Sequence, residues 1–427
     1  MQPEFRNWSR RHCCAPAAWA HPSTDDEIVA LVKAANDSGR TVKVVGAGHS
    51  FSAIAMTDGV LVSLDRMDRV VSVDVQRGLV RVQAGMRLRD FNRALAEHGL
   101  SLPIVGSIAE QSLGGLVATG THGSSLRHGN LATLIVAMRL VSGTGEVVEL
   151  PEGDPRLLGA RVNLGALGIV TEVTLRVESM FAVAEESVPM GFEAALAAFP
   201  AFIRDHEYAK LWWLPHTDAA LLFRGDRVTE PSNISAVQRW IDEHIVNAWV
   251  FPAVLWLGNK FPSLIPPLNR VTGAVYFQRR RTVGPPASVL GLAMPPRHFE
   301  AEWAVPLAHG AEALRRVRDL AEGLRVNFIL EARVVRGDDN WLSPAYGRDT
   351  IQIGTYITNP ADRAAFFAGA EAIFADYGGR AHWGKENTLS RAEAERLYPR
   401  FADFRDLVGV MDPRGTLRNA VLQRLLD

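Results

Sequence analysis

Two stretches of this chain combine glycine with hydroxyl side chains, as phosphate-binding loops do. The first, Val45-Gly46-Ala47-Gly48-His49-Ser50, ends an apolar run. Glycines there let backbone N–H groups converge on phosphate oxygens without interference from a Cβ atom. The second, residues 114–125, supplies further N–H and O–H donors. Together they predict a cradle for a long polyanionic cofactor.

The first glycine turn does not match the dinucleotide-binding fingerprint. That fingerprint requires a third glycine where Phe51 stands and a helix that begins at the loop, whereas residues 53–59 have the composition of irregular chain. A nicotinamide dehydrogenase is therefore disfavoured. Taken alone, the turn equally fits a tight turn without a ligand.

Two charged motifs lie in the second half of the chain. Glu331 and Arg333 are two positions apart in an apolar run, so strand alternation places both side chains on one face. They form either a compact polar site or a buried structural ion pair. The second motif, His382-Trp383-Gly384-Lys385, adds another cation.

The elements that must position these motifs fall into three parts. Residues 24–177 mix helices with many short strands, which predicts an α+β domain and not a regular β-α-β alternation. We expect a helix capped at Ser23 or Thr24, a helix over 88–98, and strands over 41–45, 60–64, 70–74, 79–83, 135–141, 147–150 and 169–177.

Residues 181–377 predict a second domain with its own sheet. Its expected helices are 192–204, 237–246 and 311–323, and its expected strands are 208–214, 326–335 and 350–358. The last part, from residue 381, carries the His382 motif and an amphipathic helix after Ser390.

Charge and cysteine content limit the classes of partner and the cellular compartment that we expect. The 46 Lys and Arg against 47 Asp and Glu leave no basic field for nucleic acid. The two cysteines are the neighbours Cys13 and Cys14, which make no disulfide framework and suit a reducing cytoplasm. Ser9-Arg10-Arg11 faintly imitates a twin-arginine export signal, but the apolar run behind it is short and contains Pro16, so we expect a cytoplasmic protein.

One apolar region stands out, over residues 246–267. It is interrupted by Pro252 and is too short to span a membrane, which takes about 18 uninterrupted apolar residues. We expect a helix buried in a domain core. The alternative is an exposed surface that makes a peripheral contact with a membrane or a partner.

Taken together, the motifs resemble the vanillyl-alcohol-oxidase flavoprotein family. Within it they are most similar to the branch of aldonolactone oxidases (gulonolactone and arabinonolactone oxidases) and alditol oxidases. The likeness runs from Asn7-Trp8 to Gly415, with the motifs in family order: Gly46-Ala47-Gly48-His49-Ser50, Gly106-Ser107, Ala118-Thr119-Gly120-Thr121-His122-Gly123 and His382-Trp383-Gly384-Lys385.

The resemblance implies a two-domain, PCMH-type FAD-binding fold of the α+β class. Residues 1–178 would form the FAD-binding domain and residues 179–377 an α+β substrate-binding cap. Residues 378–427 would pack back on the FAD domain.

The resemblance also implies which residues hold FAD. His49 would bond covalently to the flavin 8α-methyl, and no cysteine near Ser107 could make a second link. No metal is expected. The full set of expected cofactor contacts is Val45, Gly46, Ala47, Gly48, His49, Ser50, Ser107, Ser112, Gly115, Thr119, Gly120, Thr121, His122, Ile169, His382 and Lys385.

By the same resemblance, Glu331, Arg333 and Lys385 are the catalytic residues, and with Ser107 and Tyr356 they contact the substrate. Hydride transfer from a carbinol carbon to flavin leaves a hydroxyl proton to be accepted and negative charge to be stabilised. The two cations supply the positive field. Either Glu331 or Lys385 could accept the proton.

The expected substrate is an aldono-1,4-lactone. The alditol oxidases carry a His and a Thr where Gly354 and Tyr356 stand here, which disfavours polyols such as xylitol or sorbitol. Gly106 leaves O2 a path that alanine obstructs in plant lactone dehydrogenases, which favours an oxidase that releases H2O2. A polyol oxidase, a lactone dehydrogenase using a quinone or cytochrome, and a flavin-holding scaffold without turnover remain as alternatives.

Overall fold

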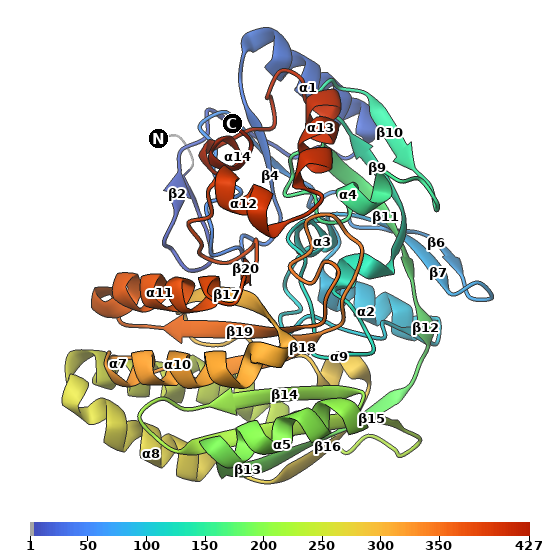
Figure 1. Cartoon of the computed structure of the whole chain (residues 1–427). Coiled ribbons are helices and arrows are strands. Elements are labelled where there is room, and N and C mark those ends of the chain that lie inside the picture. Colours follow the sequence, from blue (N-terminus) through green and yellow to red (C-terminus); the bar gives the residue numbers. More distant parts are fainter. Residues whose placement is uncertain (1–3) are drawn as a thin grey trace.

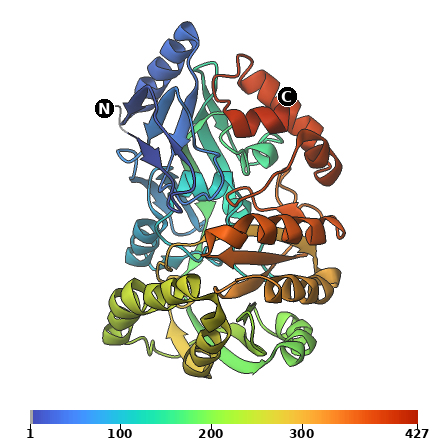
Figure 2. The same ribbon diagram turned by 90° about the vertical axis from the view of Figure 1, so that its left-hand side faces the viewer.

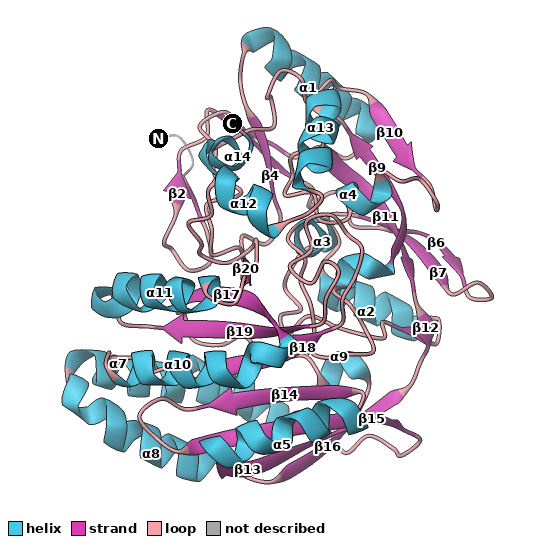
Figure 3. Cartoon of the chain, in the orientation of Figure 1, coloured by secondary structure: helices cyan, strands magenta, loops and turns pink. Residues whose placement is uncertain are grey.

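The computed structural model describes residues 4–427; residues 1–3 of the expected FAD-binding domain lie outside the described part. Figure 1 shows two halves stacked along the long axis, with several small sheets in one and a single large sheet in the other. Figure 3 shows long loops where the halves meet.

The first half contains a five-stranded antiparallel sheet in the order β10-β9-β11-β7-β6 and a three-stranded parallel sheet in the order β3-β5-β4. Two short antiparallel pairs, β1-β2 and β12-β8, flank them. The strands are β1 Phe5–Arg6, β2 Cys13–Cys14, β3 Ala18–Ala20, β4 Val42–Val45, β5 Val60–Ser63, β6 Val70–Asp74, β7 Leu79–Gln83, β8 Leu100–Ser101, β9 Ile135–Val141, β10 Val147–Leu150, β11 Ile169–Arg176 and β12 Glu178–Ser179.

The helices of this half are α1 Asp25–Ser38, α2 Leu88–Glu97, α3 Leu113–Ala118, η1 Leu131–Leu134 and α4 Leu157–Ala160. α1 begins as predicted, because the Thr24 hydroxyl accepts from the backbone N–H of Glu27 and the Glu27 carboxylate accepts from that of Ser23. It ends at Gly39, whose φ of 64° is left-handed.

The second half is built on an eight-stranded sheet, called the large sheet below, in the order β16-β13-β15-β14-β18-β19-β17-β20. Its strands are β13 Ala182–Gly191, β14 Tyr208–Trp213, β15 Ala219–Val228, β16 Arg280–Gly284, β17 Phe299–Pro306, β18 Leu330–Val335, β19 Thr350–Ile357 and β20 Arg380–Ala381. The helices of this half are α5 Phe192–Asp205, α6 Ala236–Ile241, η2 Asp242–Val250, α7 Phe251–Lys260, η3 Pro262–Leu264, α8 Ile265–Tyr276, α9 Pro286–Val289, η4 Leu307–His309, α10 Gly310–Glu322 and α11 Pro360–Ala375.

Helices cover one face of the large sheet, and the other face meets the first half and, at β14 and β15, Phe277 at the end of α8. α5, α10 and α11 lie across the covered face (Figure 1), where Trp213 of β14 packs against Phe192 of α5. Alternation then turns Trp212 to the opposite face. There the register aligns Glu302 of β17 and Glu331 of β18 on either side of Gly354. This opposite face is called the site face below.

The C-terminal part returns to the first half. After β20 the chain forms α12 Arg391–Leu397, α13 Phe401–Met411 and α14 Ala420–Leu426, which lie beside the N-terminal elements in Figure 1. The backbone N–H of Val42 donates to Thr416 O at 2.7 Å, and the Asn419 side chain donates to Ile54 O at 2.9 Å. These bonds fix the glycine turn after β4 against the C-terminal segment.

Two expectations about individual segments are wrong. The predicted cofactor loop over residues 114–125 begins as helix α3, because Leu113, Leu116 and Val117 share one buried helix face. The predicted strand over 326–335 forms only from Leu330.

The apolar region over residues 246–267 is not the buried core helix we expected. α6, η2 and α7 continue directly into one another, and with α8 they project from the second half (Figure 2). Only a narrow side is buried, such as Leu255 of α7, while Trp249 is 74% exposed and Trp256 58% exposed. Among the described residues, no helix is both long and apolar enough to cross a membrane.

Candidate active site

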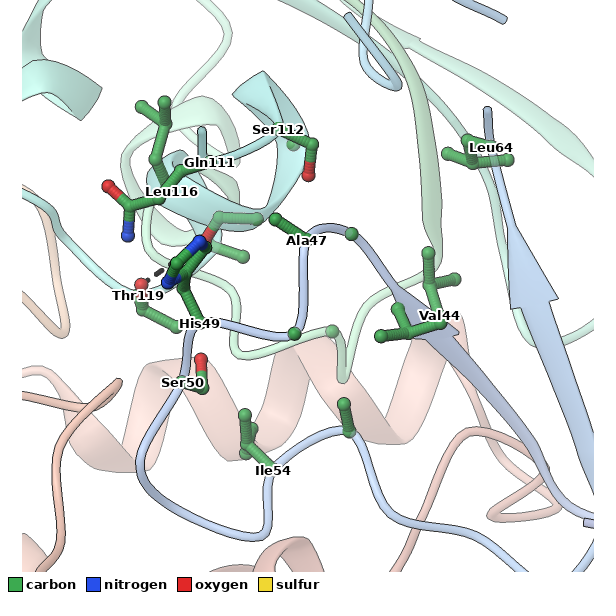
Figure 4. Close-up of a pocket in the computed structure, with 18 of the residues that line it drawn as sticks. Val44, Ala47, His49, Ser50, Ile54, Leu64, Gln111, Ser112, Leu116 and Thr119 are labelled. Carbon is green, nitrogen blue, oxygen red and sulfur yellow. Dashed lines mark hydrogen bonds between the residues drawn. The ribbon is translucent and has the colours of Figure 1, made fainter. Parts of the chain in front are cut away.

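A cavity of about 1120 Å³ opens beside the glycine turn that follows β4. Figure 4 shows Ala47 and His49 of this turn facing Ser112, Leu116 and Thr119 around α3. This volume includes space that is open to solvent, and the lining combines the glycine turn with hydroxyl side chains such as Ser112 and Thr119. Such a lining suits a cofactor that is rich in hydrogen-bond acceptors.

The glycine turn leaves no room for side chains on its inner side. A Cβ atom at Gly46 would lie 2.0 Å from Ser112 Oγ. Gly48 has a φ of 69°, and a Cβ there would meet the Phe5 ring at 3.3 Å. The backbone of the turn therefore packs directly against Ser112 and Phe5. Only glycine permits so close an approach, and a cofactor cradle requires it.

Nine of the expected cofactor contacts line this cavity: Val45, Gly46, Ala47, Gly48, His49, Ser50, Ser112, Gly115 and Thr119. Ile169 does not line it, because its side chain is fully buried in β11 while Gly168 and Val170 on either side face the cavity. Gly120 instead lies near Val162 and Pro344. The other expected contacts, Ser107, Thr121, His122, His382 and Lys385, lie where the two halves meet.

Two cations that the sequence did not single out also line the cavity, Lys43 and Arg87. Burial lowers the pKa of Lys43 to about 8, although Asp412 acts in the opposite direction. Its ammonium donates to Gly165 O and Leu417 O at 3.2 and 3.1 Å. The sequence signal for Lys43 was a single lysine inside the apolar run of β4, because a fully buried lysine is rare unless it is paired.

His49 lies half-buried on the cavity wall, with its ring 5.7 Å from that of Trp8. Burial, together with the positive charges of Lys385 and Arg87, lowers its pKa to about 4. The imidazole is therefore neutral at pH 7 and carries a free nitrogen lone pair.

Glu331 and Arg333 meet on the site face, as the strand alternation predicted. Arg333 Nε lies 3.3 Å from Glu331 Oε2, and Arg333 Nη1 donates to Ser107 Oγ at 3.0 Å. The other carboxylate oxygen of Glu331 accepts from Trp212 Nε1 at 2.8 Å, and Tyr356 OH lies 3.4 Å from Oε2. Both oxygens of Glu331 are thus held by donors from neighbouring strands.

Two further carboxylates on β17 were missed by the sequence analysis. Glu300 Oε2 lies 2.5 Å from Lys385 Nζ, and Glu302 Oε1 lies 3.0 Å from Arg333 Nη2. The signal was present in Phe299-Glu300-Ala301-Glu302-Trp303, where two acidic residues alternate with apolar ones. It is the same pattern that drew attention to Glu331.

These pairs keep the charged forms stable inside the protein. Burial alone would raise the pKa of Glu300, but the Lys385 ammonium and a hydrogen bond from His298 together outweigh it, and the pKa falls to about 2. Burial alone would lower the pKa of Arg333, but Glu331 and Glu302 raise it above its ordinary value. Burial lowers the pKa of His382 to about 3, so its ring is neutral.

The two groups of residues adjoin. The backbone N–H of Phe51, two residues after His49, donates to Gly384 O at 2.6 Å. Lys385 Nζ lies over the Phe51 ring at 4.9 Å from its centroid. The ammonium of Lys385 therefore sits between the cavity and the site face.

Tyr356 occupies space that the absence of a side chain at Gly354 creates. A Cβ atom at Gly354 would lie 2.6 Å from both Cε2 and OH of Tyr356. The ring also stacks on Phe328 at 5.8 Å. The glycine therefore allows the ring to lie across the site face.

His122, Glu302 and His382 bring three possible metal ligands within 4.8 Å of one another. Glu302 Oε1 already lies 3.0 Å from the Arg333 guanidinium, and a cation there would face that positive charge. We therefore assign no metal to this cluster.

Some buried polar atoms at this junction lack partners among the described residues, including Thr121 Oγ1 and Glu302 Oε2. Buried polar atoms nearly always have a hydrogen-bond partner. Together with the cavity and the glycine cradle, they fit a site that a cofactor and a polar substrate complete.

Comparison with known proteins agrees with this geometry. The profile of the D-arabinono-1,4-lactone oxidase family matches residues 173–425, and an FAD binding domain profile matches residues 16–151. L-gulonolactone oxidase of Scyliorhinus torazame is 32% identical over 99% of this chain and 98% of its own. L-gulono-1,4-lactone dehydrogenase of Mycobacterium tuberculosis is 35% identical over the full length of both chains. D-arabinono-1,4-lactone oxidase of Eremothecium gossypii is 35% identical over 73% of this chain and 61% of its own.

Solved structures show the same architecture. Cholesterol oxidase from B. sterolicum superposes with a TM-score of 0.85 at 16% identity, covering all of this chain and 97% of that one. A solvent-stable cholesterol oxidase gives a TM-score of 0.86 at 16% identity, covering 99% of this chain and 97% of that one. The fold is the expected two-domain α+β FAD-binding fold.

A Gly46→Ala variant tests the cradle. The added methyl must displace the Ser112 side chain or the turn, and overpacking of this kind costs about 1–3 kcal/mol. We expect flavin content, measured as visible absorbance relative to protein absorbance, to fall by roughly tenfold when flavin is limiting. Gly409→Ala, which meets nothing within 4 Å, is the matched control. Equal flavin content in both variants would contradict the cradle.

Proposed function

Because the chain belongs to the D-arabinono-1,4-lactone oxidase family of FAD-dependent enzymes, we propose that it oxidises a ring hydroxyl of an aldono-1,4-lactone and delivers the electrons to O2. The observation that carries the proposal is the meeting of Glu331, Arg333 and Lys385 beside the cavity. FAD, when bound, supplies the two-electron acceptor for hydride.

The chain's own residues would bind the lactone and handle its hydroxyl proton. Arg333 and Ser107 offer donors on the site face, and Lys385 offers a positive charge beside the cavity. Lys385 is ion-paired with Glu300, so we assign it the role of supplying positive charge beside the cavity. We assign proton acceptance to the Glu331 carboxylate on the site face.

Tyr356 supports a lactone in preference to an open-chain polyol. Its ring covers Gly354 and leaves no polar side chain at that position for further hydroxyls. A flat aromatic wall suits a compact five-membered ring better than an extended chain. The polyol alternative therefore ranks second.

Gly106 supports O2 as the acceptor. A Cβ atom there would lie 2.8 Å from Thr121 Cγ2, so the packing at this position favours glycine over the alanine that obstructs O2 in the plant lactone dehydrogenases. One similar protein is named a dehydrogenase, which makes the acceptor an experimental question. We expect stoichiometric H2O2 when L-gulono-1,4-lactone is oxidised in air. Turnover that requires an added quinone or cytochrome would contradict this assignment.

Substitutions at Glu331 and Lys385 test the catalytic assignment. Glu331→Gln removes the proton acceptor and Lys385→Met removes the positive charge, so each should slow flavin reduction by roughly 10²-fold or more. The measurement is anaerobic stopped-flow absorbance with saturating lactone. Glu312→Gln, at an exposed position of α10, is the control and should reduce at the wild-type rate. Wild-type rates in the Glu331 and Lys385 variants would contradict the assignment.

We also propose that His49 is bonded to the flavin. Its neutral imidazole on the cavity wall supports this. Acid precipitation should leave the wild-type protein yellow, whereas His49→Ala should release all its flavin into the supernatant. His21→Ala, outside the cavity, should behave as the wild type. A wild-type pellet without flavin would refute the bond.

We further propose a cytoplasmic protein that attaches peripherally to a membrane through α6, η2, α7 and α8. Trp240, Trp249 and Trp256 are exposed there, and Lys260 Nζ lies 5.0 Å from the Trp256 ring centroid. Exposed tryptophan beside basic side chains is typical of helices that lie in a membrane interface.

Vesicle sedimentation tests this attachment. Wild-type protein should pellet with vesicles of phosphatidylcholine and phosphatidylglycerol, and a Trp249→Ser/Trp256→Ser variant should lose roughly tenfold in binding because two aromatic contacts are gone. Val410→Ser, an equally exposed apolar residue on α13, is the control. Wild-type protein that stays in the supernatant would contradict the proposal.

A further inference from the structure

The two cations of the active site are each neutralised by a carboxylate that touches them. Lys385 Nζ lies 2.5 Å from Glu300 Oε2. Arg333 lies 3.0 Å from Glu302 Oε1 through Nη2 and 3.3 Å from Glu331 Oε2 through Nε. All three carboxylates are buried. An anionic ligand would therefore have to compete with these carboxylates for either cation.

The neighbouring cation on the same face follows the same rule. Lys210 stands opposite Arg333 in the register of β14 and β18, and its ammonium lies 3.0 Å from Glu185 of β13. Lys385, Arg333 and Lys210 are thus each paired with at least one carboxylate. Surfaces that recognise carboxylates do the opposite and leave an arginine or lysine available to the ligand.

Glu302 also presents an acceptor with no donor. Its Oε1 faces Arg333, while its buried Oε2 has no hydrogen-bond partner among the described residues. A sugar hydroxyl can donate to such an oxygen. The carboxylate group of an anionic ligand offers only acceptors and would be repelled from this oxygen.

We propose that Glu300 and Glu302 restrict this site to the neutral, ring-closed lactone and exclude the open-chain aldonate that the same lactone forms on hydrolysis. The inference rests on the proposed function. Hydrolysis adds one water across the ester bond, opens the ring and releases one proton, so the product is an anion with otherwise similar hydroxyls. Charge is therefore the feature that most sharply separates the two forms.

The exclusion follows from the cost of placing like charges together. An aldonate carboxylate on the site face would lose its water and meet three buried carboxylates, and such juxtaposition costs several kcal/mol in protein interfaces. The lactone carbonyl carries no net charge and loses far less on burial. Glu300 pairs with Lys385, and Glu302 pairs with Arg333. Each carboxylate thereby neutralises a positive charge that would otherwise attract the aldonate.

Competition measurements on the FAD-loaded enzyme test this inference. L-gulono-1,4-lactone is the substrate and potassium L-gulonate the competitor, at neutral pH with ionic strength balanced by potassium chloride. For the wild type we expect the inhibition constant of gulonate to exceed the KM of the lactone by roughly 100-fold or more. A gulonate constant close to that KM would overturn the inference.

Variants assign the effect to the two residues. Glu300→Gln frees Lys385 and Glu302→Gln frees one side of Arg333, so each should lower the gulonate inhibition constant by roughly tenfold or more. Perturbation of the flavin spectrum by gulonate gives the same constant without turnover. Glu186→Gln removes a carboxylate from the opposite face of β13, where it pairs with Arg224, and should change nothing.

The possible failures are distinct. If lactones do not reduce the wild-type flavin, the proposed function is wrong and the inference falls with it. If lactones reduce the flavin but neither Gln variant gains affinity for gulonate, only the inference is wrong. If a Gln variant fails to bind FAD, the wild-type ratio and the other variant decide.

Discussion

The burial of opposite charges on one face of the large sheet is the constraint on which this site depends. Each cation there is stable because a carboxylate touches it, and removing one partner of such a pair leaves an uncompensated buried charge, which typically costs about 3–5 kcal/mol. The pairs join separate strands, since Glu302 of β17 binds Arg333 of β18 across Gly354. The same ion pairs therefore join the strands of the large sheet and position the charged groups of the active site.

A second constraint joins that face to the cofactor cavity. The strand β20 adds to the edge of the large sheet, and the chain then runs directly into the segment that contains Gly384 and Lys385. The hydrogen bond from Phe51 to Gly384 fixes this segment against the glycine turn. The glycine turn and the site face thus come from distant parts of the chain. Backbone contacts hold the two together.

Much of this arrangement was predictable from local patterns. The cap of α1, the glycine turn and the shared face of Glu331 and Arg333 depend on neighbouring residues, and each was found in the sequence. The partners of those residues were not. Glu300 meets Lys385 only because β17 lies between β19 and β20 in the large sheet, a long-range pairing that spacing does not encode. The exposure of Trp249 was expected only as the alternative to a buried helix, because an apolar helix pattern does not reveal what covers it.

We propose that a flavin in the cavity accepts hydride from a lactone held on the site face. Anaerobic addition of L-gulono-1,4-lactone to the purified yellow protein, followed by visible absorbance, tests it most directly. We expect complete bleaching of the flavin bands by one equivalent of lactone and much slower bleaching by xylitol. An oxidised spectrum that persists with gulono-, galactono- and arabinonolactone alike would contradict it.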